Sequence, residues 1–97
     1  MKVVWSPMAR TKTQEILEFI SVDNPDAALT LINEFETKIQ KLKENPESGR
    51  VLLETKNDNI REIVVHKNYG VIYETNSDTI EILTIRHFRQ NFSASKL

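Results

Sequence analysis

The C-terminal part of the chain contains side chains that could bind an anion or move a proton. Arg86, His87 and Arg89 come at the end of the apolar run of residues 80–85. Arginine binds phosphates and carboxylates through paired N–H donors, and histidine can exchange a proton near neutral pH. These residue types predict an anion-binding or catalytic surface where a strand ends. The alternative is that the arginines are solvated and the histidine has a structural role.

Alternation along a regular strand would divide these side chains between two faces. Arg86 would share one face with Ile80 and Ile82, whereas His87 and Arg89 would share the other face. A bulge in the strand would change this assignment. In a regular strand, Arg86 and His87 therefore point in opposite directions and do not form a catalytic pair.

Further basic side chains precede this region in the sequence. Arg61 lies in the apolar run of residues 60–65, His66 and Lys67 follow that run, and Lys56 precedes it. Because neighbouring strands lie about 5 Å apart, these residues could gather on one surface of a sheet. Aromatic side chains nearby could stack on a nucleic-acid base: Tyr69, Tyr73, Phe88 and Phe92. We interpret Phe88 instead as a core residue.

Two helices are expected in the first half of the chain. Ser6 and Pro7 are typical of a helix start, and the apolar stripe that follows ends near Ser21. Asn24 and Pro25 repeat this start, and a second stripe runs to residue 44, before another Asn-Pro pair. A link of about three residues predicts that the two helices form an antiparallel hairpin.

Short strands are expected in the second half. Residues 60–65, 71–73 and 80–85 are rich in Ile, Val and Tyr, as in an antiparallel meander. Turn-prone segments bound them: residues 56–59, 67–70 and 76–78. Residues 3–5 should form a strand that pairs with the meander, and residues 51–53 could add another. The predicted fold is α+β, with an N-terminal strand and a two-helix hairpin packed on a small, mainly antiparallel sheet.

Length and composition limit the classes of function. With 97 residues and 39% hydrophobic content, the chain should form one domain over residues 1–92, followed by a tail over residues 93–97. It has no cysteine, two glycines and two histidines, which argues against thiolate chemistry, a phosphate-binding glycine loop and a metal site. We expect no cofactor, no membrane association and a cytoplasmic location.

Several short segments, taken in order, resemble the RelE/ParE superfamily of toxins from bacterial type II toxin-antitoxin systems. The segments that carry this resemblance are residues 5–9, 24–28, 42–50, 60–63, 69–73 and 80–83. The resemblance implies the same α+β fold. RelE-like members are ribosome-dependent mRNA endonucleases that use basic residues and a C-terminal Tyr or His. Arg61, Arg86 and His87 match those positions. ParE-like members generally lack these residues and inhibit DNA gyrase.

Charge favours the ParE-like activity. The formal net charge is -1, whereas binding inside the ribosome would benefit from a strongly positive surface. The ParE-like interpretation assigns no catalytic residue. Residues that could bind the target or a phosphate are Arg61, Lys67, Arg86, His87 and Arg89. The resemblance also implies a cognate antitoxin whose disordered segment folds along the helical hairpin and the sheet edge, and operator DNA binding only through that antitoxin. The ribosome-dependent nuclease, with ribosome and mRNA as partners, and a decayed toxin remain alternatives.

Overall fold

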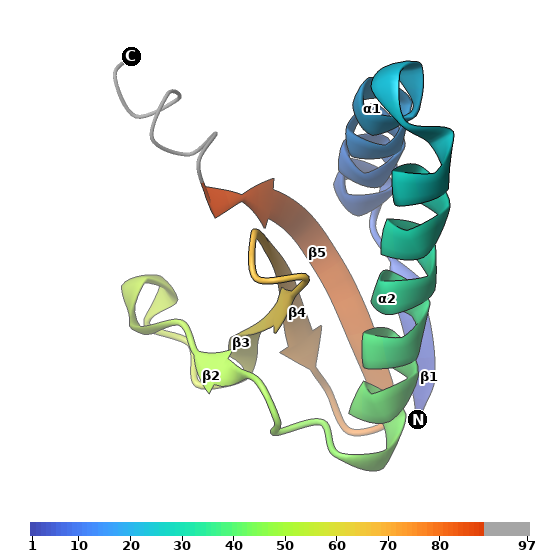
Figure 1. Cartoon of the computed structure of the whole chain (residues 1–97). Helices are drawn as coiled ribbons and strands as arrows, with labels where there is room; N and C mark the ends of the chain where they lie inside the picture. The colour runs from blue at the N-terminus through green and yellow to red at the C-terminus, as the bar shows by residue number, and fades with distance from the viewer. Residues whose placement is uncertain (89–97) are drawn as a thin grey trace.

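The computed structural model describes residues 1–88, which form two helices against one side of a five-stranded sheet (Figure 1). The elements in chain order are β1 (Lys2–Trp5), α1 (Pro7–Asp23), α2 (Pro25–Glu44), β2 (Arg50–Val51), the 3₁₀ turn η1 (Leu53–Thr55), β3 (Ile60–Val65), β4 (Tyr69–Thr75) and β5 (Thr79–His87). The strand order is β1-β5-β4-β3-β2, and only the β1–β5 pair is parallel. The predicted α+β fold is confirmed.

The helical hairpin turns at a single residue. Asn24 donates its backbone N–H to Ile20 at the end of α1, and its side-chain oxygen accepts from Ala27 at the start of α2. One asparagine therefore ends one helix and caps the next. The predicted link of three residues was too long, because α1 continues to Asp23. The predicted end of α2 at Glu44 is confirmed.

The start of α1 is tied directly to β5. The Ser6 hydroxyl accepts a hydrogen bond from the Ala9 amide and donates one to the carbonyl of Leu83, at 3.0 and 2.7 Å. Ser6 thus caps the helix and anchors it to a strand that lies 77 residues later in the sequence. This link sets the position of α1 over the C-terminal half of β5.

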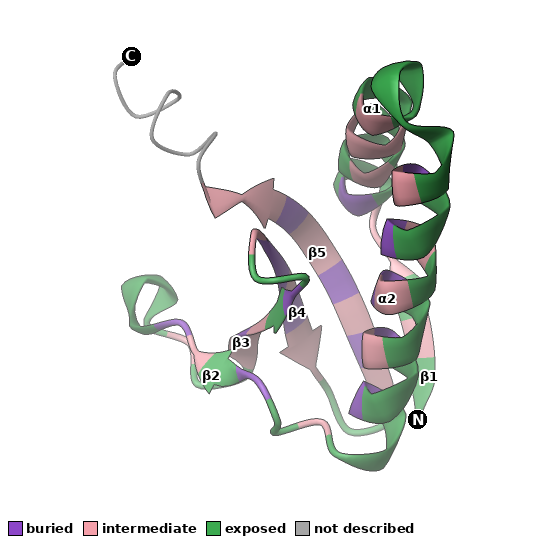
Figure 2. Cartoon of the chain, viewed as in Figure 1, coloured by how far each residue is buried: buried purple, intermediate pink, exposed green. Residues whose placement is uncertain are grey.

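A single hydrophobic core fills the space between the hairpin and the sheet. The buried residues of α2 face the strands, α1 contributes buried Ala9 and half-buried side chains, and much of the outer surface of both helices is exposed (Figure 2). Residues that form the core are Ala9, Leu31, Phe35, Ile39, Leu42, Val65, Tyr69, Val71, Tyr73, Ile80, Ile82 and Ile85. We call the sheet face that carries these strand residues the covered face, and the opposite one the open face. No helix in residues 1–88 is long and apolar enough to cross a membrane.

A β-bulge changes which residues of β5 share a face. Tyr73 pairs with Ile82, but the preceding residue Ile72 pairs with Thr84, so Leu83 is the extra residue. After the bulge, Ile85 takes up the covered face that Ile82 occupies before it. The regular alternation predicted from the sequence was therefore wrong beyond residue 82. His87 lies on the covered face and Arg86 on the open face.

The turn between β3 and β4 lies earlier in the sequence than predicted. His66 and Lys67 adopt positive φ angles of 53° and 48°, and the Asn68 amide bonds to the His66 carbonyl. Tyr69 and Gly70 already belong to β4. The prediction treated Gly70 as a turn residue, but Gly70 lies in a strand. A glycine is needed at this position because a side chain from β3 fills the space where a Cβ atom would lie. The predicted strand at residues 51–53 is shorter, since Leu53 starts η1.

Candidate functional site

A buried carboxylate lies at the centre of the open face. Glu62 on β3 has no exposed side-chain area, although neither α1 nor α2 covers this side of the sheet. Its Oε2 accepts from Nε of Arg86 at 2.6 Å, and its Oε1 accepts from Nη2 of Arg86 at 2.8 Å. Oε1 also accepts from Nη2 of Arg50 at 2.7 Å. Two arginines from β2 and β5 therefore compensate one charge that folding removes from water. We call these three residues the Glu62 cluster.

Gly70 provides the space that the Glu62 carboxylate occupies. A Cβ atom on Gly70 would overlap Oε2 of Glu62 and would lie 2.7 Å from its Cδ. Gly70 pairs with Arg86 on β5, so the carboxylate crosses the middle strand to reach the arginine. The absence of a side chain at residue 70 is therefore what allows β3 and β5 to be joined across β4.

Arg86 is held by contacts on two sides. Its hydrogen bonds with Glu62 raise the pKa of the guanidinium, and the charges of Glu62 and Glu54 act in the same direction against its partial burial. The guanidinium carbon also lies 5.7 Å from the centre of the Phe88 ring, within the range of a cation–π contact. The interpretation of Phe88 as a core residue was wrong, because its half-buried ring packs on Arg86 instead.

Arg61 is bound to the loop that follows α2. Its Nη1 donates to the carbonyls of Glu47 and Gly49, at 3.2 and 2.8 Å. The buried hydroxyl of Tyr73 holds the same loop, because it donates to the carbonyl of Pro46 and accepts from the Gly49 amide. Burial raises the pKa of Tyr73, although the hydrogen bond from Gly49 opposes the shift. Tyr73 is therefore a structural clamp rather than a surface for stacking.

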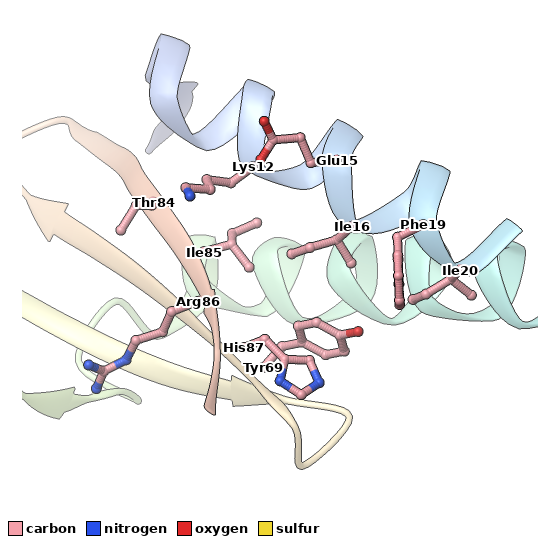
Figure 3. Close-up of a pocket in the computed structure, with 10 residues that line it drawn as sticks. All are labelled: Lys12, Glu15, Ile16, Phe19, Ile20, Tyr69, Thr84, Ile85, Arg86 and His87. Carbon is pink, nitrogen blue, oxygen red and sulfur yellow. The ribbon is translucent and has the colours of Figure 1, made fainter. Parts of the chain in front are cut away.

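His87 lies in a groove between α1 and the end of β5. The groove has a volume of about 610 Å³. Its walls combine apolar side chains with a few charged ones (Figure 3): Lys12, Glu15, Ile16, Phe19, Ile20, Tyr69, Thr84, Ile85, Arg86 and His87. The His87 ring meets the Tyr69 ring edge to face, with centroids 4.8 Å apart. Burial raises the pKa of Tyr69. Figure 3 shows the Arg86 guanidinium on the other side of the β5 ribbon.

Lys67 is an exposed side chain in the β3–β4 turn, close to the chain end of β5. The Phe88 amide donates to the carbonyl of Asn68, which ties this turn to β5. His66, next to Lys67, places Nδ1 3.1 Å from Oε1 of Glu34 on α2. The predicted site residue Arg89 lies outside the described residues. The structure thus fixes the surroundings of four of the five predicted site residues.

These side chains do not form the single basic surface that the sequence suggested. Arg61 pairs with Tyr73 and His87 pairs with Tyr69, so the two are separated by four residues along β4, or about 13 Å. Arg86 lies on the opposite face from both of them. Each of the two arginines already binds an acceptor within the protein. Within residues 1–88 no group of three potential metal ligands is present.

Sequence reasoning missed the two residues that define the open face. In the sequence, Glu62 and Arg50 belong only to the segments that resemble the family, residues 60–63 and 42–50, and no binding role was predicted for either. A usable signal was present, because a charged residue stood in the middle of the apolar run of residues 60–65. Such a residue is either exposed or paired, and Arg86 with Gly70 on the following strands supplied both a counter-charge and the space. The register between the strands was needed to join them.

Comparisons with known proteins agree with this fold. Residues 3–92 match the family model of the ParE toxin of the type II toxin-antitoxin system, parDE. A protein named "Putative toxin Y4kP" from Sinorhizobium fredii (strain NBRC 101917 / NGR234) is 31% identical over 91 residues, which are 94% of this chain and 92% of that protein. The chain belongs to the ParE toxin family of type II toxin-antitoxin systems.

A solved structure supports the fold independently of sequence identity. The structure described as the chromosomal ParDE TA system from P. aeruginosa matches 90% of this chain and 95% of its own chain, with a TM-score of 0.73. Sequence identity across this match is 17%, so the likeness concerns the fold. The family model and the relative of 31% identity confirm the resemblance to the RelE/ParE superfamily that short sequence segments predicted.

Proposed function

We propose that this toxin inhibits DNA gyrase without cleaving RNA and that a cognate antitoxin neutralises it in the cytoplasm. The observation that carries the proposal is the engagement of Arg86 with a buried carboxylate. A ribosome-dependent nuclease needs cationic side chains that are available to the scissile phosphate. In this protein the guanidinium of Arg86 is already bidentate with Glu62, and Arg61 donates to backbone carbonyls.

The arrangement of the three nuclease candidates also supports a role without catalysis. General acid–base chemistry requires the proton-transfer group and the phosphate-binding groups within hydrogen-bond reach of one reacting centre. His87 and Arg86 lie on opposite faces of the sheet, and Arg61 is about 13 Å further along the strands. The net charge of -1 adds little attraction to ribosomal RNA.

A pair of assays with purified protein tests the target. We expect the protein to inhibit DNA supercoiling by gyrase and to leave mRNA intact on programmed ribosomes. Arg61→Ala should leave any gyrase inhibition in place once folding is verified by circular dichroism. Cleavage of mRNA that is lost in Arg61→Ala and His87→Gln would support the nuclease instead. Inactivity in both assays would support a decayed toxin.

The antitoxin is expected to cover apolar surface on the helical hairpin. Phe19, Val22 and Leu29 are 74%, 82% and 60% exposed around the hairpin turn. An adjacent shallow groove is lined mainly by apolar side chains from both helices, including Leu17 and Ile32. Exposed apolar patches of this kind are typical of binding surfaces for amphipathic segments. Co-purification with the product of the adjacent gene tests this partner. Val22→Glu should weaken the complex, whereas Asp78→Lys, at an exposed position in the β4–β5 turn, should not.

A further inference from the structure

We propose that Arg50 and Arg86 form an oxyanion-binding site on the open face, which the Glu62 carboxylate keeps filled. The ligand class is a phosphate or a small carboxylate. Glu62 would then be a specificity residue, because its carboxylate prevents this face from holding a nucleic-acid phosphate. This inference deepens the proposed function. It rests on the part of that proposal that says the protein does not cleave RNA.

The geometry of the Glu62 cluster is that of an oxyanion complex. Two parallel N–H donors of Arg86 meet the two carboxylate oxygens, and a third donor comes from Arg50. Guanidinium groups bind phosphates and carboxylates through the same paired arrangement. A phosphate with two oxygens in these positions would make the same three hydrogen bonds. The two arginines are therefore already oriented for such a ligand.

The space for a ligand exists because of Gly70. The carboxylate lies directly over the Gly70 Cα, where any side chain would collide with it. Removal of the Glu62 side chain beyond Cβ would leave a void bounded by Gly70 and the two guanidinium groups. The void would open toward solvent beside Arg50, whose side chain is 62% exposed, whereas that of Arg86 is 29% exposed. A small anion could thus enter from the open face.

The local charge balance explains why an outside anion does not compete in the native protein. Arg50 and Arg86 carry two positive charges, and Glu62 carries one negative charge between them. Glu54 contributes a second negative charge that acts on Arg86. The four charges cancel, so an arriving phosphate meets no net attraction and a filled site. Removing the carboxylate leaves one net positive charge and unpaired donors.

The experiment is chemical rescue of the Glu62→Ala variant. Its thermal unfolding is measured in sodium phosphate, sodium acetate and sodium chloride at equal ionic strength. We expect phosphate and acetate, but not chloride, to raise the unfolding temperature of Glu62→Ala, and to have no such effect on the native protein. Glu81→Ala is the matched control, because Glu81 also lies on the open face but pairs with Glu74 far from the cluster. Equal anion effects in Glu62→Ala and Glu81→Ala would overturn the proposal.

A second variant keeps the proposal testable if Glu62→Ala does not fold. Glu62→Ser removes the charge together with the atoms that fill the space over Gly70, and leaves a small polar side chain. Phosphate affinity measured by calorimetric titration should be about tenfold or more tighter for folded Glu62→Ser than for Glu81→Ser, since one opposing charge is gone and the space is open. Unchanged affinity in folded Glu62→Ser would overturn the proposal. Adding Arg50→Ala to either Glu62 variant should abolish the gain.

A short single-stranded RNA distinguishes the two sources of phosphate. Binding of inorganic phosphate alone by the Glu62 variants indicates a site for free small anions, whereas binding of both ligands indicates access to a nucleic-acid backbone. Absence of both kinds of binding overturns the site. These measurements do not involve gyrase. A native protein that fails to inhibit gyrase would therefore disprove the proposed target while leaving the anion site to its own test.

Discussion

The two faces of the sheet solve the problem of burial in different ways. On the covered face, helices α1 and α2 exclude water from tyrosines and branched aliphatic side chains. On the open face, neither α1 nor α2 is present, yet Glu62 is as buried as the core residues. The arginines that cover it also supply its counter-charges. One face is therefore held by apolar burial, and the other by a salt bridge network with defined hydrogen-bond geometry.

This difference shows that residue type alone does not indicate function in this fold. Arg86 looked like a ligand for an external phosphate, but in the folded protein it stabilises an internal carboxylate together with Arg50. The histidine on the covered face packs against an aromatic ring. Breaking a buried charge pair costs more than removing a surface charge, because the remaining charge stays partly desolvated. Substitutions on the two faces should therefore differ in size and in the conditions that modify them.

The largest effect is expected from Gly70→Ala. The new methyl group would displace the Glu62 carboxylate from Arg86. We expect the free energy of unfolding to fall by roughly 2–4 kcal/mol. The loss is smaller than for a fully buried ion pair, because the Arg86 side chain is partly exposed. Urea unfolding measures the loss. In the Glu62→Ala background the same change should cost little, because the carboxylate is absent. An equal cost in both backgrounds would contradict the assignment of the glycine to the cluster.

On the covered face, Tyr73→Phe should have the next largest effect. It removes the donor to Pro46 and leaves the buried Gly49 amide without its acceptor, which should cost about 2 kcal/mol. Chemical denaturation measures this cost, and hydrogen exchange should show faster opening of the loop that follows α2. Tyr69→Phe is the matched control on the same strand and face. If both substitutions lowered the free energy of unfolding equally, the hydrogen bonds of the Tyr73 hydroxyl would not stabilise the protein in the way we propose.

A smaller effect is expected from His87→Ala. Loss of the edge-to-face contact with Tyr69 should reduce stability by about 1 kcal/mol. Because we assign His87 no proton-transfer role, the concentration that half-inhibits gyrase supercoiling should change less than twofold. Val22→Ala, at a highly exposed position, serves as the stability control. A folded His87→Ala protein that no longer acts on its target would show that His87 has a functional role. The covered face would then carry a functional residue in addition to the core.

The smallest effect on stability is expected from the titration of two tyrosines, and it is measurable only at alkaline pH. Burial raises the pKa of Tyr73 and Tyr69 above the usual 10.0, so the folded state retains these protons at a pH where the unfolded state releases them. The stability from this difference is complete below pH 10 and is lost as pH rises through the folded-state pKa. Urea unfolding at about pH 8 and about pH 11 should show a loss that is smaller in Tyr73→Phe than in the native protein. An identical loss in both would show that Tyr73 does not contribute.

Local signals in the sequence predicted both ends of α2 and of β3 correctly. Pro25 and the Asn45-Pro46 pair marked both ends of α2, since proline fits the first turn of a helix and blocks its continuation. The Ile- and Val-rich run of residues 60–65, preceded by a turn-prone segment, gave the bounds of β3 at Ile60 and Val65. The hairpin link was overestimated because one asparagine caps both helices. The bulge at Leu83 could not be predicted, because it depends on which residues of β4 pair with β5.

The sequence by itself determined the fold class and the family, because periodicity, helix caps and the order of short segments are properties of neighbouring residues. Only the tertiary structure decided what the charged residues do. Glu62, Gly70 and Arg86 come from three different strands, and Arg50 comes from a fourth. These side chains contact one another only because of the strand register. A register shift of one residue would move a strand's side chains to the other face of the sheet. The chemistry of an arginine depends on its nearest anion, and in this protein folding brings that anion from within the chain.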